Sequence, residues 1–286
     1  MSSLPLKFNN SLCIFATKRS GHHAIINWIG MNLPQSCIHL NDINIEILCD
    51  PDSSPVIKYN RKSLFRWTPA ETNNGLMAAV VYDQQENTSA KMTGNQDEFF
   101  KFVKKYKKRS GGINNFLTSI NQEIINFENI SYAPHLDKIS QSLYFKNKQV
   151  KIIGILRDYY NTLASSLKSL EKSPIDYSVS ELTAMTQIWL SLAQEYIKDP
   201  KSIILFNLWH SDKNYRSALC KQLGLNNNDY GYDQISSFGG GSSFDKKHSS
   251  LHERYVSMID EPLFQQFANN PEIIELNKEI FNLEIF

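Results

Sequence analysis

The chain has 286 residues, 30 of them basic and 29 acidic, and its net charge of +1 excludes the broad cationic surface of a general nucleic-acid or membrane-surface binder. It has no basic amino-terminal region followed by a long apolar run, and no segment reaches the roughly 18 apolar residues of a membrane span. We therefore expect a cytoplasmic protein without a membrane span. The four cysteines lack the spacing of a metal or disulfide framework, which indicates reduced core thiols.

The first informative stretch runs from residue 11 to residue 31. Residues 12–15 form a short apolar run of strand type, and a helix follows whose apolar face is made by Ile25, Ile26, Trp28, Ile29 and Met31. The loop at 17–23 places two cations and a glycine where the helix begins, so backbone N–H groups and the positive helix end face one point. This pattern predicts a cradle for an anion, most naturally phosphate.

The loop does not fit the Walker A pattern. Ala16 stands at the first glycine, His22 at the lysine and His23 at the hydroxyl that would bind magnesium. Loss of that hydroxyl predicts phosphate binding without a dedicated metal, with Lys18 and Arg19 supplying the charge. A Ser-Gly turn is also common for capping and backbone freedom alone, so this stretch leaves both interpretations open.

The chain between residues 32 and 148 gives weaker signals. Strands are expected at residues 36–40 and 78–82, a loop at 51–55, a polar aperiodic surface segment at 59–75 and a helix at 97–109. A helix is also expected at residues 136–145, and a strand at 202–206 with a helix after it.

A second strand-loop-helix unit begins at Gln149. Residues 149–156 are the strongest strand signal in the chain, and residues 161–170 continue as a helix with leucines on one side. Arg157 sits between them, at the carboxyl end of a buried strand, and Ser165 lies in the helix. Ligands of open α/β sheets bind at such strand ends.

These two units together resemble the sulfotransferases that use 3′-phosphoadenylyl sulfate (PAPS). The resemblance lies in an R-S-G loop after an amino-terminal strand, followed much later by strand-Arg-Asp and a serine eight residues after the arginine. It implies that the first loop binds the 5′-phosphosulfate and the later pair binds the 3′-phosphate. The implied nucleotide-binding residues are Lys18, Arg19, Ser20, Gly21, His22, His23, Arg157 and Ser165.

A glycine-rich loop at residues 236–245 stands where this family has a loop that covers the nucleotide. The resemblance implies that backbone N–H groups of Gly239, Gly240, Gly241 and Ser242 contact the 3′-phosphate, although a triple glycine is also typical of a flexible linker. Departures from the family pattern include His22-His23 in the first loop and Tyr159 where proline is common.

Sulfuryl transfer also needs a group that removes the acceptor's proton. Cytosolic-type sulfotransferases carry a base histidine in a His-Leu sequence before a short helix, and His135-Leu136 matches it. We therefore expect His135 to be the base and Arg19 to assist the leaving phosphate. Other members use a carboxylate, which leaves Glu46, Asp83 and Glu86 open.

The sequence thus predicts one α/β domain over residues 1–286, with a largely parallel central sheet flanked by helices and a P-loop-like sulfotransferase architecture. The expected reaction is transfer of a sulfuryl group from PAPS to a hydroxyl or amine of a small molecule, glycan or lipid, without a metal, giving 3′-phosphoadenosine 5′-phosphate (PAP). The alternatives are an ATP-dependent P-loop-like kinase and a non-catalytic nucleotide-binding protein of the same fold.

Overall fold

A computed structural model describes most of the chain. It covers residues 4–5, 7–50, 56–60, 64–68, 78–84, 88–91, 112–170, 179–234 and 251–285. The expected loop at 51–55, the expected helix at 97–109 and the glycine-rich loop at 236–245 lie outside these residues.

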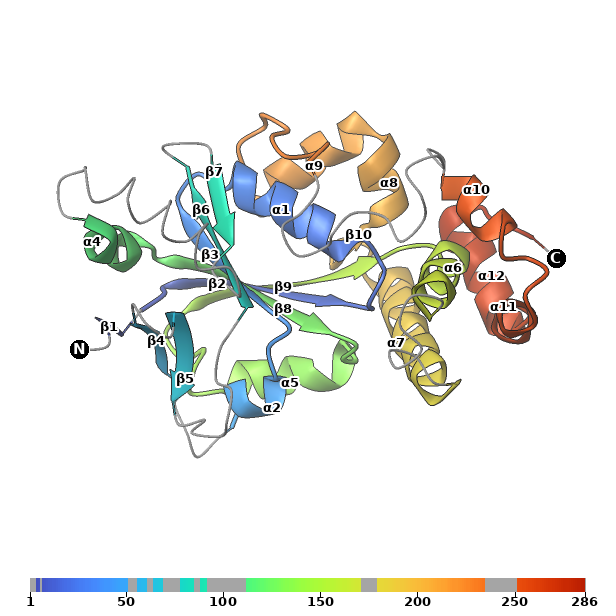
Figure 1. The fold of residues 1–286 in the computed structure, drawn as a ribbon, viewed down its shortest axis with the longest axis horizontal. Helices are drawn as coiled ribbons and strands as arrows, with labels where there is room; N and C mark the ends of the chain where they lie inside the picture. Colours follow the sequence, from blue (N-terminus) through green and yellow to red (C-terminus); the bar gives the residue numbers. More distant parts are fainter. Residues whose placement is uncertain are drawn as a thin grey trace.

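The architecture is built on a seven-stranded sheet (Figure 1). In spatial order its strands are β10 (Ile203–Leu205), β9 (Gln149–Leu156), β2 (Asn10–Ala16), β8 (Gln122–Glu128), β3 (Cys37–Asn41), β6 (Ala78–Asp83) and β7 (Thr88–Lys91). The first five run parallel to one another. At one edge, β6 pairs antiparallel with β3, and β7 pairs antiparallel with β6. The expected α/β class with a largely parallel sheet is confirmed.

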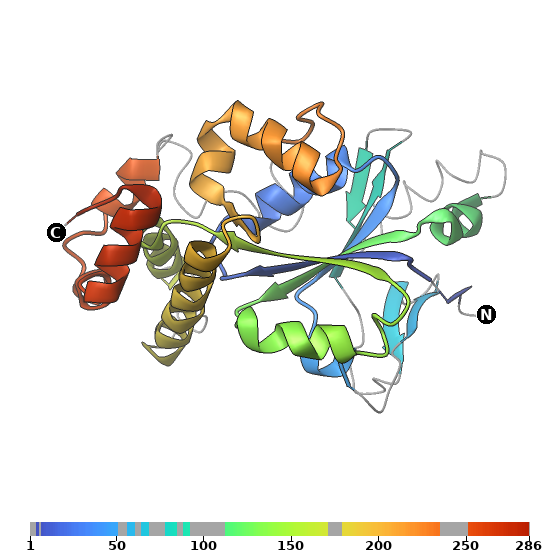
Figure 2. The ribbon, with the colours of Figure 1, turned by 180° about the vertical axis from the view of Figure 1, so that it is seen from behind.

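Helices cover both faces of this sheet (Figures 1 and 2). One face carries α1 (His22–Asn32), α8 (Phe206–Ser211) and α9 (Lys213–Leu223), and the other carries α2 (Ile45–Leu48) and α5 (Ala133–Gln141). Beyond the carboxyl ends of the central strands lie α6 (Tyr159–Leu170), α7 (Val179–Lys198), α10 (Leu251–Val256), α11 (Pro262–Ala268) and α12 (Pro271–Phe281). The short helix α4 (Gly112–Ser119) precedes β8.

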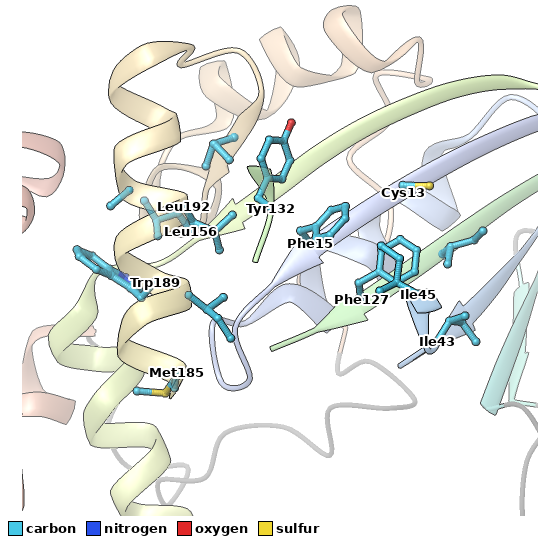
Figure 3. Close-up of a cluster of buried hydrophobic side chains, with 14 of the residues drawn as sticks. Cys13, Phe15, Ile43, Ile45, Phe127, Tyr132, Leu156, Met185, Trp189 and Leu192 are labelled. Atoms are coloured by element: carbon cyan, nitrogen blue, oxygen red, sulfur yellow. The ribbon is translucent and has the colours of Figure 1, made fainter. Parts of the chain in front are cut away.

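The alternation of side chains along β2 divides the core into two layers. Leu12 and Ile14 pack with α1 on one face, whereas Cys13 and Phe15 point to the other. Phe15 stacks against Phe127 with ring centroids 4.9 Å apart, in the cluster shown in Figure 3. Complete burial of such a side chain contributes roughly 1.5–3 kcal/mol, so β2 anchors both layers.

A second sheet is formed by β1 (Leu4–Pro5), β4 (Val56–Asn60) and β5 (Leu64–Thr68), all antiparallel. The sequence segment 59–75 was expected to be aperiodic, and that expectation is wrong for residues 59–60 and 64–68. The apolar and aromatic residues in it are instead spaced at the period of two that suits a strand.

Most of the other expected elements are confirmed within one or two residues at their starts. The helix expected at 161–170 begins at Tyr159, and the strand expected at 202–206 ends at Leu205, where α8 begins. The helix expected at 136–145 instead runs from Ala133 to Gln141, with a proline in its first turn, where the missing N–H of proline costs nothing. Among the described helices, none is long and apolar enough to cross a membrane.

Candidate functional site

The loop between β2 and α1 is held in a conformation that requires glycine at one position. Gly21 has a φ of +80° and stands at the N-cap of α1. A Cβ built there would lie 2.3 Å from the ring of Phe206, so there is no space for a side chain at position 21. The positive φ is a second reason for glycine, because residues with a side chain rarely adopt it. Arg19 also has a positive φ, of 68°. The loop is therefore a fixed turn.

The amino end of α1 opens into this loop without a side-chain cap. No capping hydrogen bond forms at Gly21, and the first turn contains no acidic residue. The first N–H groups of a helix have no partner within the helix, and together with the helix dipole they favour an anion. Thr17 is 1% exposed, and its hydroxyl makes no hydrogen bond with any described residue. These groups lie where the sequence predicts an anion cradle.

Arg157 joins this cradle from the next strand. It follows β9, which pairs with β2, and its Nη1 donates to the carbonyl oxygen of Arg19 at 3.2 Å. Trp189 on α7 fixes its backbone by donating to the Arg157 carbonyl at 2.7 Å. The side chain is 3% exposed, yet its Nε and Nη2 make no hydrogen bond within the described part of the chain. Burial lowers the pKa of Arg157 to about 10, which leaves the guanidinium charged at neutral pH.

A second arginine lies close to Arg157. Arg254 on α10 acts on Arg157 as a like charge, and burial together with little compensation lowers the pKa of Arg254. Its buried Nε also makes no hydrogen bond with described residues. Asp158 favours both charged guanidiniums, but its carboxylate oxygens accept from Asn161 and Asn207 instead. Guanidinium N–H groups without described acceptors, one of them on an arginine that contacts the loop before α1, suit a phosphate.

Two histidines and a glutamate form the wall of the cradle at the end of β8. His22 Nε2 lies 3.0 Å and His23 Nε2 lies 3.3 Å from the same oxygen of Glu128. Burial, followed by the charge of His22, lowers the pKa of His23 to about 4, so that imidazole is neutral at pH 7. Hydrogen bonds and charge from both histidines hold the pKa of Glu128 below its ordinary value against the effect of burial.

The same three side chains have the ligand atoms that a metal ion would need, within 4.8 Å of one another. Ser20 hydrogen-bonds to Nδ1 of His22 at 3.2 Å, which orients that ring. Two N–H groups donated to one carboxylate oxygen hold these three side chains together without an ion. The arrangement therefore fits a hydrogen-bonded wall as well as it fits a metal site.

A groove of about 530 Å³ opens beside the cradle, where β3 and β8 end. It is connected to the cradle through Asn129, whose side-chain oxygen accepts from the backbone N–H of Lys18 at 2.9 Å. His135 on α5 lines the groove. Its Nδ1 lies 2.7 Å from the carbonyl oxygen of Ser131, so Nδ1 carries the proton and Nε2 is the basic nitrogen. Nε2 lies 3.5 Å from a carboxylate oxygen of Glu46.

The sequence-predicted site residues that the structure describes come from one edge of the sheet. Residues 18–23 form the cradle, Arg157 contacts it, and Ser165 lies buried on α6, the helix after Arg157. Arg19 donates to Ser169 on the same helix. Gly239, Gly240, Gly241 and Ser242 lie outside the described residues.

Three residues of this site escaped the sequence analysis. Glu128 ends β8 and Asn129 follows it, and the sequence did not reveal this strand; Arg254 lies on a helix that the sequence gave no reason to place here. A signal existed for the first two, because Ile124, Ile125 and Phe127 make a mainly apolar strand once Glu123 and Asn126 are accepted inside it. Nothing in the local sequence marks Arg254.

No family model matches the chain, and no curated protein matches it. Two solved structures are similar to it, each at 12% sequence identity. Mouse sulfotransferase SULT7A1 complexed with PAP aligns with a TM-score of 0.39 over 95% of this chain and 89% of its own. The sulfotransferase domain from the curacin biosynthetic pathway aligns with a TM-score of 0.41 over 98% and 100%. Because both TM-scores are below 0.5, functional inference depends on the geometry of the chain's own residues.

Proposed function

We propose that this protein is a PAPS-dependent sulfotransferase that transfers a sulfuryl group to a hydroxyl or amine of its acceptor. The observation that carries the proposal is Arg157, a charged guanidinium that is 3% exposed and has two nitrogens without a described acceptor. Burying an unpaired charge costs several kcal/mol unless a ligand neutralises it. An anion bound at Arg157 and Arg254 offsets that cost.

The position of Arg157 calls for a ligand with two anionic groups. Its guanidinium contacts the backbone of Arg19, so the anion beside Arg157 is a neighbour of the anion at the start of α1. A nucleotide with one phosphate at the 5′ position and another at the 3′ position provides two such groups. In this proposal the cradle takes the 5′-phosphosulfate, and Arg157, Arg254 and Ser165 take the 3′-phosphate.

The cradle supplies what the leaving group needs. Negative charge grows on the bridging phosphate oxygen as the bond from sulfur to that oxygen breaks. The N–H groups at the start of α1 and the cation of Arg19 stabilise this charge. The sulfuryl group passes directly to the acceptor, without a covalent intermediate with the protein. PAP is then released.

The groove holds the acceptor and the base. As the acceptor oxygen forms its bond to sulfur, its proton passes to Nε2 of His135, whose other nitrogen already donates to Ser131. The carboxylate of Glu46 stabilises the imidazolium that results. Lys138 holds Glu46 in place with contacts of 2.6 and 2.8 Å.

Thermal unfolding with nucleotides tests the proposal without knowledge of the acceptor. A ligand that binds only the folded state at a hundred times its Kd stabilises by about 2.7 kcal/mol. PAP is expected to raise the melting temperature much more than AMP, with no magnesium present, because Arg157 and Arg254 bind only the 3′-phosphate. The control variant Lys278→Met removes an exposed cation on α12 and is expected to respond to PAP as the native protein does.

Three results would contradict the proposal. Equal stabilisation by PAP and AMP would mean that the protein has no site for the 3′-phosphate. Stabilisation by ATP only with magnesium would favour a kinase. Binding of PAP without release of PAP from PAPS, over a broad panel of acceptors, would favour a non-catalytic nucleotide-binding protein.

A further inference from the structure

Most of the described residues that line the groove beside the cradle are polar or charged, and none of them is Phe, Tyr or Trp. Of the apolar lining residues, Ile43 and Ile45 are buried and Ile130 is half-buried. Asp42, Glu46 and the amide of Asn129 line the groove with His135. Sites for flat apolar ligands are lined mostly by apolar and aromatic side chains. The described lining therefore suits a ligand with several polar groups better than a sterol or a simple phenol.

The charge of the groove is negative next to the cationic cradle. Glu46 is paired with Lys138 at 2.6 Å, so these two charges largely cancel. Asp42 is exposed and forms no ion pair with any other residue that the structure describes. Partial desolvation of its carboxyl group and the charge of Glu128 raise the pKa of Asp42, so a bound cation would favour its charged form.

The backbone at Asp42 is fixed beside the groove. Asp42 directly follows β3 with a φ of 52°, a left-handed conformation that aspartate tolerates better than most residues. The N–H of the next residue, Ile43, donates to the carbonyl of Asn126 at 3.0 Å. Asp42 lines the groove, and the charge of Lys18 in the cradle also acts on its carboxylate. Because the backbone here is already ordered, only the side chain of Asp42 has to be ordered when a ligand binds.

We propose that the groove binds an acceptor that carries a protonated amine beside several hydroxyl groups, with the chemistry of an amino sugar. This inference rests on the proposed function. The amine pairs with Asp42, and a hydroxyl next to it loses its proton to His135 as it accepts the sulfuryl group. An acidic glycan is disfavoured, because Asp42 and the anionic nucleotide both repel it.

Binding of three matched oligosaccharides tests the groove. The probes are a tetrasaccharide of glucosamine, its fully N-acetylated form and an alternating tetrasaccharide of glucuronic acid and N-acetylglucosamine. Calorimetry is carried out at a pH that keeps the amines protonated, with the protein saturated in PAP. The glucosamine tetrasaccharide is expected to bind at least about tenfold more tightly than either of the others, as expected for one charge-assisted hydrogen bond.

Two variants locate this binding. Asp42→Asn keeps the shape of the side chain and is expected to weaken binding of the glucosamine tetrasaccharide about tenfold. The matched control Asp137→Asn removes an exposed carboxylate on α5 outside the groove and is expected to leave binding unchanged. Both variants are expected to retain the stabilisation by PAP.

Equal binding of the three probes, preference for the acidic one, absence of binding, or equal effects of the two variants would overturn the inference. The response to PAP separates this result from failure of the proposed function. If the protein bound the amine through Asp42 but was not stabilised by PAP, the amine site would stand and the sulfotransferase assignment would be wrong. If PAP stabilised the protein but the amine did not bind through Asp42, the nucleotide site would stand and the amine inference would be wrong.

Discussion

The two ends of the central sheet bury charged side chains in opposite ways. At the amino end, Glu123 is fully buried, and its oxygens accept from Ser11 at 2.5 Å, Tyr144 at 2.6 Å and Lys148 at 2.8 Å. At the carboxyl end, Arg157 is almost as deeply buried, and two of its nitrogens have no described acceptor. The first charge is neutralised by the protein itself, whereas the second keeps two nitrogens without a described acceptor and is the one to which we assign a ligand.

Burial alone does not distinguish these two charged side chains, because both are buried. They differ in whether their hydrogen-bonding atoms have partners among the described residues. Lys148 also lies 3.4 Å from the ring centroid of Tyr144, so the cation that serves Glu123 is itself packed. A buried group whose donors and acceptors all have hydrogen-bond partners contributes to stability. A buried group with unsatisfied donors lowers the stability of the free protein, and a ligand that accepts from those donors removes that cost on binding.

The largest expected effect separates activity from stability at the carboxyl end. His135→Gln removes the proposed base and is expected to lower turnover roughly a hundredfold to ten-thousandfold, while stabilisation by PAP is unchanged. Turnover is measured as release of PAP from PAPS with an amine-bearing sugar. Ser140→Ala, at an exposed site on the same helix, serves as control. Full turnover in His135→Gln would move the base to a carboxylate.

The next effect is on stability at the amino end. Glu123→Gln leaves the ammonium of Lys148 partly buried without its carboxylate and is expected to cost about 3–5 kcal/mol. Urea unfolding measures this cost. The control Glu284→Gln breaks an exposed pair with Lys278 and is expected to cost less than about 1 kcal/mol. Similar costs for the two variants would mean that the buried cluster is not structural.

Arg157→Met reverses that pattern at the other end. Its unfolding free energy is expected to stay within about 1 kcal/mol of the native value, because the change removes two unpartnered donors along with one hydrogen bond. PAP affinity is expected to fall roughly a hundredfold, which is about 2.7 kcal/mol. Isothermal calorimetry and urea unfolding measure the two quantities.

Arg216 offers a matched buried arginine for this experiment. Its Nε and Nη2 donate to the carboxylate of Asp229, and its Nη1 donates to the carbonyl oxygen of Trp209. Arg216→Met is therefore expected to destabilise the protein by about 2–3 kcal/mol without changing the response to PAP. If the two arginine variants behaved alike, open hydrogen-bonding capacity would not distinguish the ligand site.

The smallest expected effect concerns His23. Its pKa falls from 6.5 in the unfolded chain to about 4 in the folded one, so the folded state takes up fewer protons and loses stability as pH drops below 6.5. The loss due to His23 is expected to be about 2 kcal/mol between pH 7 and pH 5. His23→Gln is expected to lack this part of the pH dependence of urea unfolding. An unchanged pH profile in that variant would contradict the neutral wall of the cradle.

The sequence revealed the two strand-loop-helix units but not β8 or α10, for a physical reason. The strands β2 and β9 carry apolar runs that need no partner to be recognised, and the loops after them follow directly. β8 was missed because Glu123 and Asn126 leave it only three apolar residues. One of the residues that donate to the buried Glu123 carboxylate, Ser11, is 112 positions away in the chain. Arg254 likewise acquires its role only when α10 packs against α6. Long-range compensation of charge cannot be seen in a local pattern.

The ring of Phe206 ties two positions of the chain to one another. It fills the space where a side chain at Gly21 would go, and its ring centroid lies 5.1 Å from the guanidinium carbon of Arg157. A smaller residue at position 206 would make room for alanine at 21, yet it would also remove the aromatic surface beside the arginine, and the positive φ would still oppose alanine. In a library that randomises positions 21, 157 and 206 together, the surviving combinations should therefore be strongly interdependent. Glycine should persist at 21 even where 206 is small.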